Sequence, residues 1–207
     1  MRVIAGDLRG RSFAAVPGSA TRPTTDRVRE AWASTVISLA PKGSGFEGLY
    51  VLDAFAGSGA LGIEALSRGA AHCVFVERHR RALTVIHANL ASLGLDTSER
   101  SLVIAGDIFA ASTQKRLPAR LPTSAPHDLL ILDPPYDLEQ GSVKALLADI
   151  ARSGALGPGT LISYEQGIDA EEGLKGSVLS SDGSPFELEM LSCKTYGTTQ
   201  IRYYLCR

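Results

Sequence analysis

One stretch decides the fold: Val51-Leu52-Asp53-Ala54-Phe55-Ala56-Gly57-Ser58-Gly59-Ala60-Leu61-Gly62. An apolar run ends at an acidic residue, passes through a turn of small residues and enters a helical pattern. This order is typical of a buried parallel strand that leads into a helix whose N-terminus faces a ligand. The three glycines also fit G-x-G-x-x-G, so they alone allow a dinucleotide site, a site for S-adenosylmethionine (SAM) or a plain tight turn.

The acidic residue at the end of this strand favours SAM. Asp53 stands four residues before Gly57, at the mouth of the Gly-rich turn. A carboxylate at this position would repel a pyrophosphate by about 1–4 kcal/mol at contact distance, depending on the effective dielectric. The same carboxylate would attract a ligand that carries an ammonium and a sulfonium.

Strands and helices alternate from residue 49 onward. The pattern predicts strands over 49–54, 73–77, 102–105, 128–132 and 160–165, and helices over about 59–68, 79–93, 108–117 and 139–153. Residues 166–185 predict a loop with one short strand, and 186–193 and 198–206 predict a closing hairpin around residues 194–197. This alternation indicates an α/β fold, with a mostly parallel sheet, helices on both faces and an antiparallel edge.

The first 20 residues predict a small β-hairpin extension, followed by one domain over residues 21–207. Strand-like runs at 2–5 and 12–16 flank a charged turn, and such a hairpin is too small to be stable alone. Thr24 or Thr25 is then expected to cap a helix whose apolar stripe includes Val28 and Trp32.

Positive charge is concentrated near the N-terminus. Residues 1–30 have a charge balance of +3 in a chain of 207 residues whose net charge is −1. Arginine suits bidentate phosphate contacts, so this segment is a candidate nucleic-acid clamp, and a solvated charged face is the alternative. The candidate RNA contacts are Arg2, Arg9, Arg11, Arg22 and Arg27.

Composition argues against several other classes of protein. Cys73, Cys193 and Cys206 lack metal-ligand spacing and cannot all pair, which favours a reduced, cytoplasmic protein. The four histidines have no ligand-like spacing either, so no metal is expected. No apolar run approaches the roughly 20 residues that a membrane helix needs.

Four predicted strands in succession end at, or just before, an acidic residue: Asp53, Glu77, Asp107 and Asp133. Ligands of open α/β sheets lie outside the carboxyl ends of the strands. Glu77 follows Gly57 by 20 residues, where a carboxylate can accept both ribose hydroxyls of a nucleoside. Asp107 can accept the exocyclic amine of an adenine, with Ile108 and Phe109 covering the ring, although an ordinary helix start explains these two equally well.

Asp133-Pro134-Pro135-Tyr136 is the most specific signal in the chain. Two prolines stiffen the turn after a buried strand and remove two N–H donors, so carbonyl oxygens and the Asp133 carboxylate remain as acceptors. Such a site suits an exocyclic amine whose nitrogen faces a methyl donor. Tyr136 offers a stacking face worth about 1–3 kcal/mol to an extruded base. The alternative is a rigid turn with a core tyrosine.

These motifs resemble, in order, those of class I SAM-dependent amino-methyltransferases. Further segments are similar to the RsmD-type 16S rRNA guanine-N2 methyltransferases, and the likeness runs from Arg2 to about Tyr204. The segments are Arg2-Val-Ile-Ala-Gly6, Arg9-Gly-Arg11, Arg22-Pro-Thr-Thr-Asp-Arg-Val-Arg-Glu30, Asp53-Ala-Phe-Ala-Gly-Ser-Gly-Ala-Leu-Gly62-x-Glu64-Ala-Leu-Ser-Arg-Gly69 and Lys194-x-Tyr-Gly197.

The resemblance implies a Rossmann-like class I methyltransferase fold with a central seven-stranded sheet, and SAM as the methyl donor. It implies 16S rRNA as substrate, within the small ribosomal subunit, for a monomer outside any membrane. By position, Asp133 to Tyr136 would hold the guanine, and Lys194 would join the RNA contacts. The implied cofactor-binding residues are Asp53, Phe55, Ala56, Gly57, Ser58, Gly59, Glu77, Asp107 and Ile108, with Thr24 and Thr25 closing over SAM.

Other functions remain open at this stage. A DNA amino-methyltransferase uses the same Asp-Pro-Pro-Tyr site, although such enzymes carry a target-recognition insert and the interval between Gly62 and Asp133 is filled with core strands. A dinucleotide-dependent oxidoreductase explains the glycines and Glu77 but leaves Asp53 and Asp133-Pro134-Pro135-Tyr136 unexplained. Methylation of a ring carbon needs a cysteine nucleophile in the substrate pocket, and no cysteine follows the fourth strand closely. A non-catalytic RNA-binding module would not need the acidic strand ends.

Overall fold

The computed structural model describes residues 1–18, 25–40, 43, 45–97, 99–117, 126–135, 138–168, 173–174, 176–179 and 181–207. Its helices are α1 (Asp26–Leu39), α2 (Ala60–Ser67), α3 (Arg80–Leu93), α4 (Ala111–Gln114) and α5 (Gln140–Arg152). Its strands are β1 (Tyr50–Asp53), β2 (His72–Glu77), β3 (Ser101–Ala105), β4 (Leu129–Leu132), β5 (Leu161–Gly167), β6 (Ser177–Leu179), β7 (Pro185–Tyr196) and β8 (Thr199–Cys206).

The strands form one mixed sheet in the order β3-β2-β1-β4-β5-β8-β7-β6. The first five are parallel, and β8 joins β5 antiparallel to begin the C-terminal hairpin. This confirms the expected α/β fold with an antiparallel edge. Within the described residues the sheet has eight strands rather than seven, because the short strand expected within 166–185 is β6, which pairs with β7.

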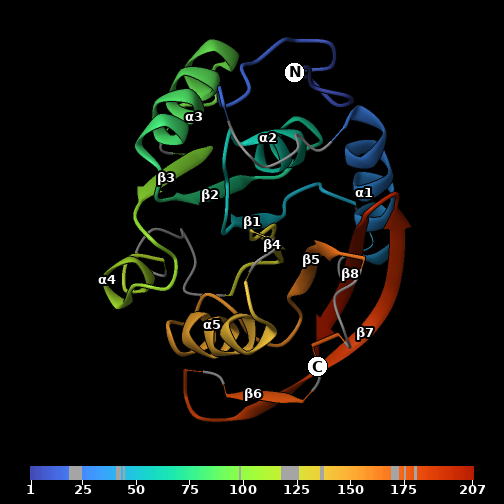
Figure 1. Ribbon diagram of the computed structural model, residues 1–207, viewed down its shortest axis with the longest axis vertical. Helices are drawn as coiled ribbons and strands as arrows, with labels where there is room; N and C mark the ends of the chain where they lie inside the picture. Colours follow the sequence, from blue (N-terminus) through green and yellow to red (C-terminus); the bar gives the residue numbers. More distant parts are fainter. Residues whose placement is uncertain are drawn as a thin grey trace.

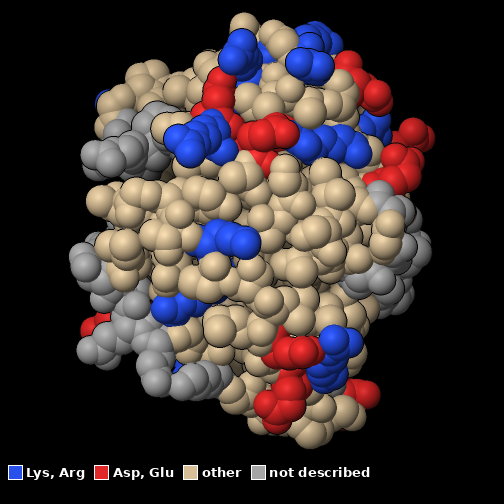
Figure 2. All heavy atoms as spheres, turned by 90° about the vertical axis from the view of Figure 1, so that its right-hand side faces the viewer, with Lys and Arg blue, Asp and Glu red and all other residues tan. Residues whose placement is uncertain are grey.

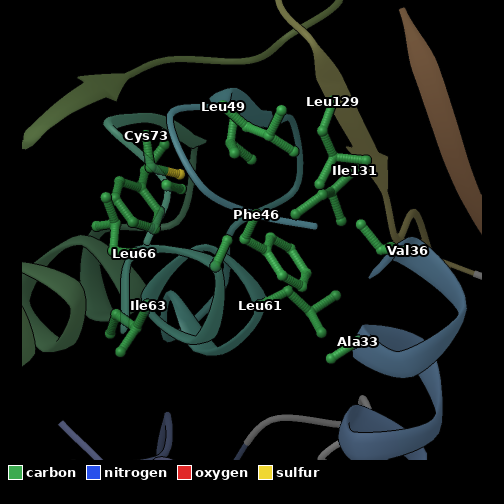
Figure 3. Packing of buried hydrophobic residues seen from close by; sticks show 14 of the residues in the cluster. Ala33, Val36, Phe46, Leu49, Leu61, Ile63, Leu66, Cys73, Leu129 and Ile131 are labelled. Atoms are coloured by element: carbon green, nitrogen blue, oxygen red, sulfur yellow. The ribbon is translucent and has the colours of Figure 1, made fainter. Parts of the chain in front are cut away.

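Helices cover both faces of the sheet, as Figure 1 shows, with α1, α2 and α3 on one side and α4 and α5 on the other. On the first face, Trp32 and Val36 of α1 and Leu61 of α2 pack with residues of the strands. Figure 3 shows the centre of this cluster around Phe46, between α2, α1 and the sheet. Each face thus has its own apolar core, and the carboxyl ends of the parallel strands are fixed between them.

Two glycines let α2 begin close to the sheet. Gly59 caps the helix with φ +84°, a conformation that L side chains rarely adopt. A Cβ atom on Gly62 would lie 2.2 Å from the Phe75 ring and 2.7 Å from the Cys73 sulfur. The missing side chain at Gly62 therefore allows α2 to pack directly on β2, as in dinucleotide-type βα turns.

The N-terminal hairpin differs from its prediction, since no regular strands form in residues 1–18. One isolated bridge joins Arg2 and Ser12, supported by backbone hydrogen bonds such as Val3 N to Arg11 O (2.9 Å). The reason is that Glu64 of α2 accepts the next two backbone N–H groups, those of Ile4 (3.0 Å) and Ala5 (3.1 Å). The amides that would extend a ladder are bound to a helix instead.

Two other boundaries differ from the sequence pattern. The helix expected over 108–117 is only α4, four residues long, because it lacks a side-chain cap and is followed by Pro118. The final hairpin turns at Gly197 and Thr198, since β7 continues to Tyr196. The remaining strand and helix bounds lie within three residues of those predicted.

We expect Glu64→Ala to lower the free energy of unfolding by about 3–5 kcal/mol, because it leaves two backbone amides without their acceptor and removes the more buried of the two carboxylates that pair with Arg68. Glu64 is 1% exposed, and it also accepts a hydrogen bond from Arg68 Nε at 2.8 Å. Urea unfolding measures the loss. The exposed Glu187→Ala is the control and should change stability by less than about 0.5 kcal/mol; equal losses in both variants would contradict the assignment.

Candidate functional site

A cavity of about 750 Å³ opens at the carboxyl ends of β1, β2 and β4. Its size lies within the range of small-molecule sites, about 300–1,000 Å³. The acidic strand ends and the Gly-rich turn line it together, as the sequence predicted for the ligand edge of an α/β sheet. The lining includes Asp53, Phe55, Ala56, Gly57, Ser58, Glu77, Asp107, Ile108, Phe109, Asp133 and Pro135.

Asp53 joins the first strand to the helix that follows it. Its side chain is buried, and one carboxylate oxygen accepts the backbone N–H of Gly62 at 3.2 Å. Burial raises the pKa of Asp53 to about 7, and the negative charge of Glu77 raises it further, while hydrogen bonds from the Gly62 and Phe55 amides lower it. The carboxyl group therefore fixes the Gly-rich turn through its hydrogen bonds and also lines the cavity.

Glu77 holds the Gly-rich turn from the neighbouring strand. One of its oxygens accepts the N–H of Gly57 at 2.8 Å, and the other accepts the N–H groups of Arg78 (2.8 Å) and His79 (2.7 Å). A carboxylate oxygen has two lone pairs, so the oxygen that binds Gly57 can accept one further hydrogen bond, from a ligand hydroxyl. The predicted ribose acceptor is thus fixed in orientation by three amides.

Asp107 lies at the far side of the cavity, after β3. It accepts the N–H of Phe109 at 3.1 Å and forms a partly exposed ion pair with Arg78 at 3.1 Å. Ile108 is buried beneath, and the Phe55 and Phe109 rings lie 6.1 Å apart between centroids. These apolar surfaces flank the position where the sequence predicted an adenine.

The Asp133-Pro134-Pro135 turn closes the opposite side of the cavity. Asp133 is half-buried, Pro134 is buried and Pro135 is exposed. The carbonyl oxygen of Pro135 accepts the N–H of Leu138 at 3.0 Å, so it serves the start of α5. The Asp133 side chain, which lines the cavity, is one acceptor that this turn offers to a ligand. Tyr136, like Thr24 and Arg22, lies outside the described residues.

The N-terminal segment forms part of the cavity wall, which the sequence did not predict. Met1 and residues 15–18 line it. Asn89 of α3 holds this segment, because its amide group bonds both the N–H (2.8 Å) and the C=O (2.9 Å) of Ala14 and also the Ser58 carbonyl (2.9 Å). One side chain thus connects the N-terminal segment to the Gly-rich turn.

The predicted RNA contacts have several different roles in the structure. Arg2 forms an ion pair with Asp26, and the guanidinium of Arg11 donates to the Leu93 and Ser92 carbonyls at the end of α3. Arg9 and Arg27 are exposed. At the upper end of the face that holds α1, β7 and β8, cationic and acidic side chains are interleaved (Figure 2). The charges at this end of the face are therefore mixed rather than uniformly basic.

Several predicted site residues are absent from the cavity lining: Gly59, which instead caps α2, the buried Pro134, Lys194 and Thr25. Lys194 is exposed near the end of β7, opposite Ile201 of β8. Thr25 is exposed and caps α1, accepting the Val28 N–H at 3.4 Å, which confirms the predicted helix start. Neither contributes to the cavity as described.

Sequence reasoning missed Glu165, a buried acid in β5. The signal that identified the four other acids, a carboxylate at the end of an apolar strand, also applies to it. Sequence reasoning also missed the exposed arginines at the start of α3, Arg80 and Arg81, which line the cavity mouth beside Arg78.

Other kinds of site find no support in the described part of the chain. Its His, Cys, Asp and Glu side chains do not gather in groups of three or more that could hold a metal ion. No helix there has the length and apolar character to cross a membrane.

Comparison with known proteins points to one family. Residues 1–205 match the family described as Conserved hypothetical protein 95. The chain is 36% identical over 204 residues to "Putative rRNA methyltransferase YlbH" of Bacillus subtilis, covering 99% of this chain and 98% of that protein. It is 33% identical over 172 residues to "Ribosomal RNA small subunit methyltransferase D" of Escherichia coli K12, covering 82% and 76%.

The fold has a close counterpart among solved structures. "Putative methyltransferase yhhF" from Escherichia coli superposes with a TM-score of 0.75 at 29% identity, covering 100% of this chain and 98% of that one. The whole described architecture, including the N-terminal segment and the C-terminal hairpin, therefore belongs to a recurrent methyltransferase fold.

Asp53→Asn should make stability less dependent on pH. The pKa of Asp53 is about 7 in the folded chain and about 3.9 when unfolded, so the folded state holds a proton that the unfolded chain releases. The wild-type free energy of unfolding should therefore fall, by roughly a few kcal/mol, as pH rises from about 4 to about 7. Asparagine cannot ionise but still offers an oxygen to Gly62.

The measurement is urea unfolding of both proteins at about pH 5 and about pH 8. The wild type should lose more stability than the variant between the two conditions. Equal losses would show that Asp53 is already ionised at the lower pH.

Proposed function

Because this chain belongs to the Conserved hypothetical protein 95 family, the RsmD family of rRNA methyltransferases, we propose that it transfers a methyl group from SAM to N2 of a guanine in 16S rRNA. The observation that carries this proposal is that the Gly-rich turn and Asp133 line the same cavity. A methyl donor and an amine acceptor need adjoining sites of this kind.

The residues of the cavity fit SAM. The Glu77 oxygen that accepts the Gly57 N–H has one further acceptor position for a ribose hydroxyl, because the other oxygen already accepts two amides, and the apolar surfaces of Ile108 and Phe109 suit an adenine ring. The acids Asp53, which is buried, and Asp133, which is half-buried, favour a cation over a pyrophosphate. When bound, SAM supplies an already activated, electrophilic methyl group.

The protein mainly orients and shields the reacting groups. Positioning of two reactants can contribute about 7–11 kcal/mol to lowering a barrier. Asp133 accepts a hydrogen bond from the exocyclic amine and thereby aims the nitrogen lone pair into the cavity, while the two prolines offer no competing N–H donors. Exclusion of water from the cavity helps, because positive charge is dispersed during the transfer.

The substrate is proposed from the relatives' names and from the N-terminal segment. That segment lines the cavity mouth and carries the exposed Arg9, so RNA bound there would deliver an extruded guanine to Asp133. Tyr136 would stack on the base, and Arg22, Arg27 and Lys194 would add backbone contacts. We place the enzyme in the cytoplasm, acting as a monomer on the small ribosomal subunit.

Asp133→Ala should abolish methyl transfer, lowering the rate by at least about 100-fold, because the amine loses its acceptor. SAM affinity, measured by calorimetry, should stay within a few-fold of the wild type. Lost SAM binding would show that Asp133 holds the cofactor instead of the base.

The substrate is identified by supplying labelled SAM with free 16S rRNA, assembled small subunits or duplex DNA. Label at N2 of one guanine in rRNA supports the proposal. The same nucleotide should lack its methyl group in rRNA from a knockout strain. Label in DNA alone would favour the DNA amino-methyltransferase. Thermal stabilisation by NAD but not by SAM would favour an oxidoreductase.

Arg9→Ala and Arg11→Ala should separate RNA binding from stability. Among the described residues, none forms a hydrogen bond or an ion pair with the exposed Arg9 side chain. Its loss should therefore weaken RNA binding several-fold, and the number of counterions released on binding, measured from the salt dependence of the affinity, should fall by roughly one. Loss of Arg11 should cost about 1 kcal/mol of stability, because it caps α3. Unchanged RNA affinity in the Arg9 variant, measured across a salt series, would remove Arg9 from the RNA contacts.

A further inference from the structure

Asp133 has an acidic neighbour on the next strand. Strands β4 and β5 are parallel and pair Leu132 with Tyr164, so the residues that follow, Asp133 and Glu165, lie side by side. Adjacent strands are about 4.8 Å apart, and paired residues point to the same face of a sheet. The two carboxyl groups therefore face the same layer, the one formed by α1 and α2.

A narrow gap beside the main cavity joins these two acids, and Asp133 and Leu61 line both spaces. Asp133 and Glu165 line it together with Trp32, Ser163 and Ile201, and it has no room for a water molecule. Trp32 closes it from α1 by donating its indole N–H to Ser163 Oγ at 2.9 Å. Without water between them, the two carboxyl groups interact in a medium of low dielectric.

Asp133 belongs to both spaces, whereas Glu165 is described only in the gap. Glu165 is 8% exposed. It can therefore affect a ligand in the main cavity through Asp133 but does not contact that ligand.

Among the described residues, Asp53 of β1 acts electrostatically on Asp133, and Tyr203 of β8 lies within electrostatic reach of Glu165. Trp32 of α1 and Leu61 of α2 add uncharged surfaces. Burial raises the pKa of Asp133 well above its usual range, and the charges of Glu165 and then Asp53 raise it further. Burial likewise raises the pKa of Tyr203, so its phenol stays neutral.

On the basis of the proposed methyl transfer, we infer that Glu165 is a positioning residue that makes Asp133 a stronger proton acceptor for the substrate amine. An exocyclic amine that gains a methyl group must lose a proton. The N–H bond breaks, the proton forms an O–H bond with Asp133, and the nitrogen becomes neutral; the proton later passes to water through the cavity. A neighbouring negative charge stabilises the protonated form of Asp133 and so favours this step.

The test compares the pH dependence of the methyl-transfer rate in single turnovers. In the wild type the rate should rise as Asp133 ionises. In Glu165→Gln the rise should move to lower pH by about one to two units, because one negative charge is removed. The plateau rate should fall by about threefold to tenfold, because the acceptor is weaker.

Two further variants separate charge from packing. Glu165→Asp keeps the carboxylate and should keep the wild-type profile. Ser163→Ala lies in the same gap and breaks the hydrogen bond to Trp32 without changing the charge, so it should lower stability but leave the pH profile unmoved. A profile in Glu165→Gln equal to that of the wild type, or a shift equally large in Ser163→Ala, would overturn the inference.

A second readout does not depend on catalysis. Carbon-13 NMR of labelled aspartate, assigned with Asp133→Asn, follows the titration of Asp133 directly. Its pKa should fall in Glu165→Gln and stay near the wild-type value in Glu165→Asp. If the wild type methylates no rRNA, the proposed function fails while this titration still tests the pair; if rRNA is methylated but the titration is unchanged in Glu165→Gln, only the inference about Glu165 fails.

Discussion

Backbone N–H groups hold the buried carboxylates of the ligand edge in place, and the site depends on this. A parallel sheet brings the carboxyl ends of β1, β2, β4 and β5 together, so acids at these ends repel one another in a desolvated layer. Glu77 is compensated by three amides and Asp53 by two, including the Gly62 amide. The Gly-rich turn and the acidic edge therefore stabilise each other, and neither would keep its shape alone.

The N-terminal segment shows how a short peptide without regular structure is fixed to such a domain. A few of its backbone groups pair with each other around the Arg2–Ser12 bridge, and others are bound by side chains of the domain: Glu64 and Ser67 of α2 and Asn89 of α3. Buried backbone groups need partners, and side chains on helices can supply them as well as a sheet can. The segment thereby becomes part of the cavity wall without adding to the sheet.

Much of this arrangement could be predicted from the sequence because it follows from local chemistry. The turn after Asp53, the acids at Glu77 and Asp107 and the helix start at Thr25 are all encoded within a few residues. The two N-terminal runs meet at one antiparallel bridge rather than as the regular strands predicted, because further amides of the segment bind Glu64 and Asn89, which are distant in the sequence. The structural role of Arg11 depends in the same way on the end of α3. The roles of Tyr136, Thr24 and Arg22 remain predictions.

Trp32 is the single tryptophan of the chain, and its indole lies against the gap shared by Asp133 and Glu165. An indole reports changes in nearby charge through its fluorescence, and this one is almost fully shielded from solvent. The protein therefore contains an intrinsic optical probe beside its proposed reaction centre. Proton uptake or ligand entry at that centre can be followed by emission in the unmodified protein, without an added dye.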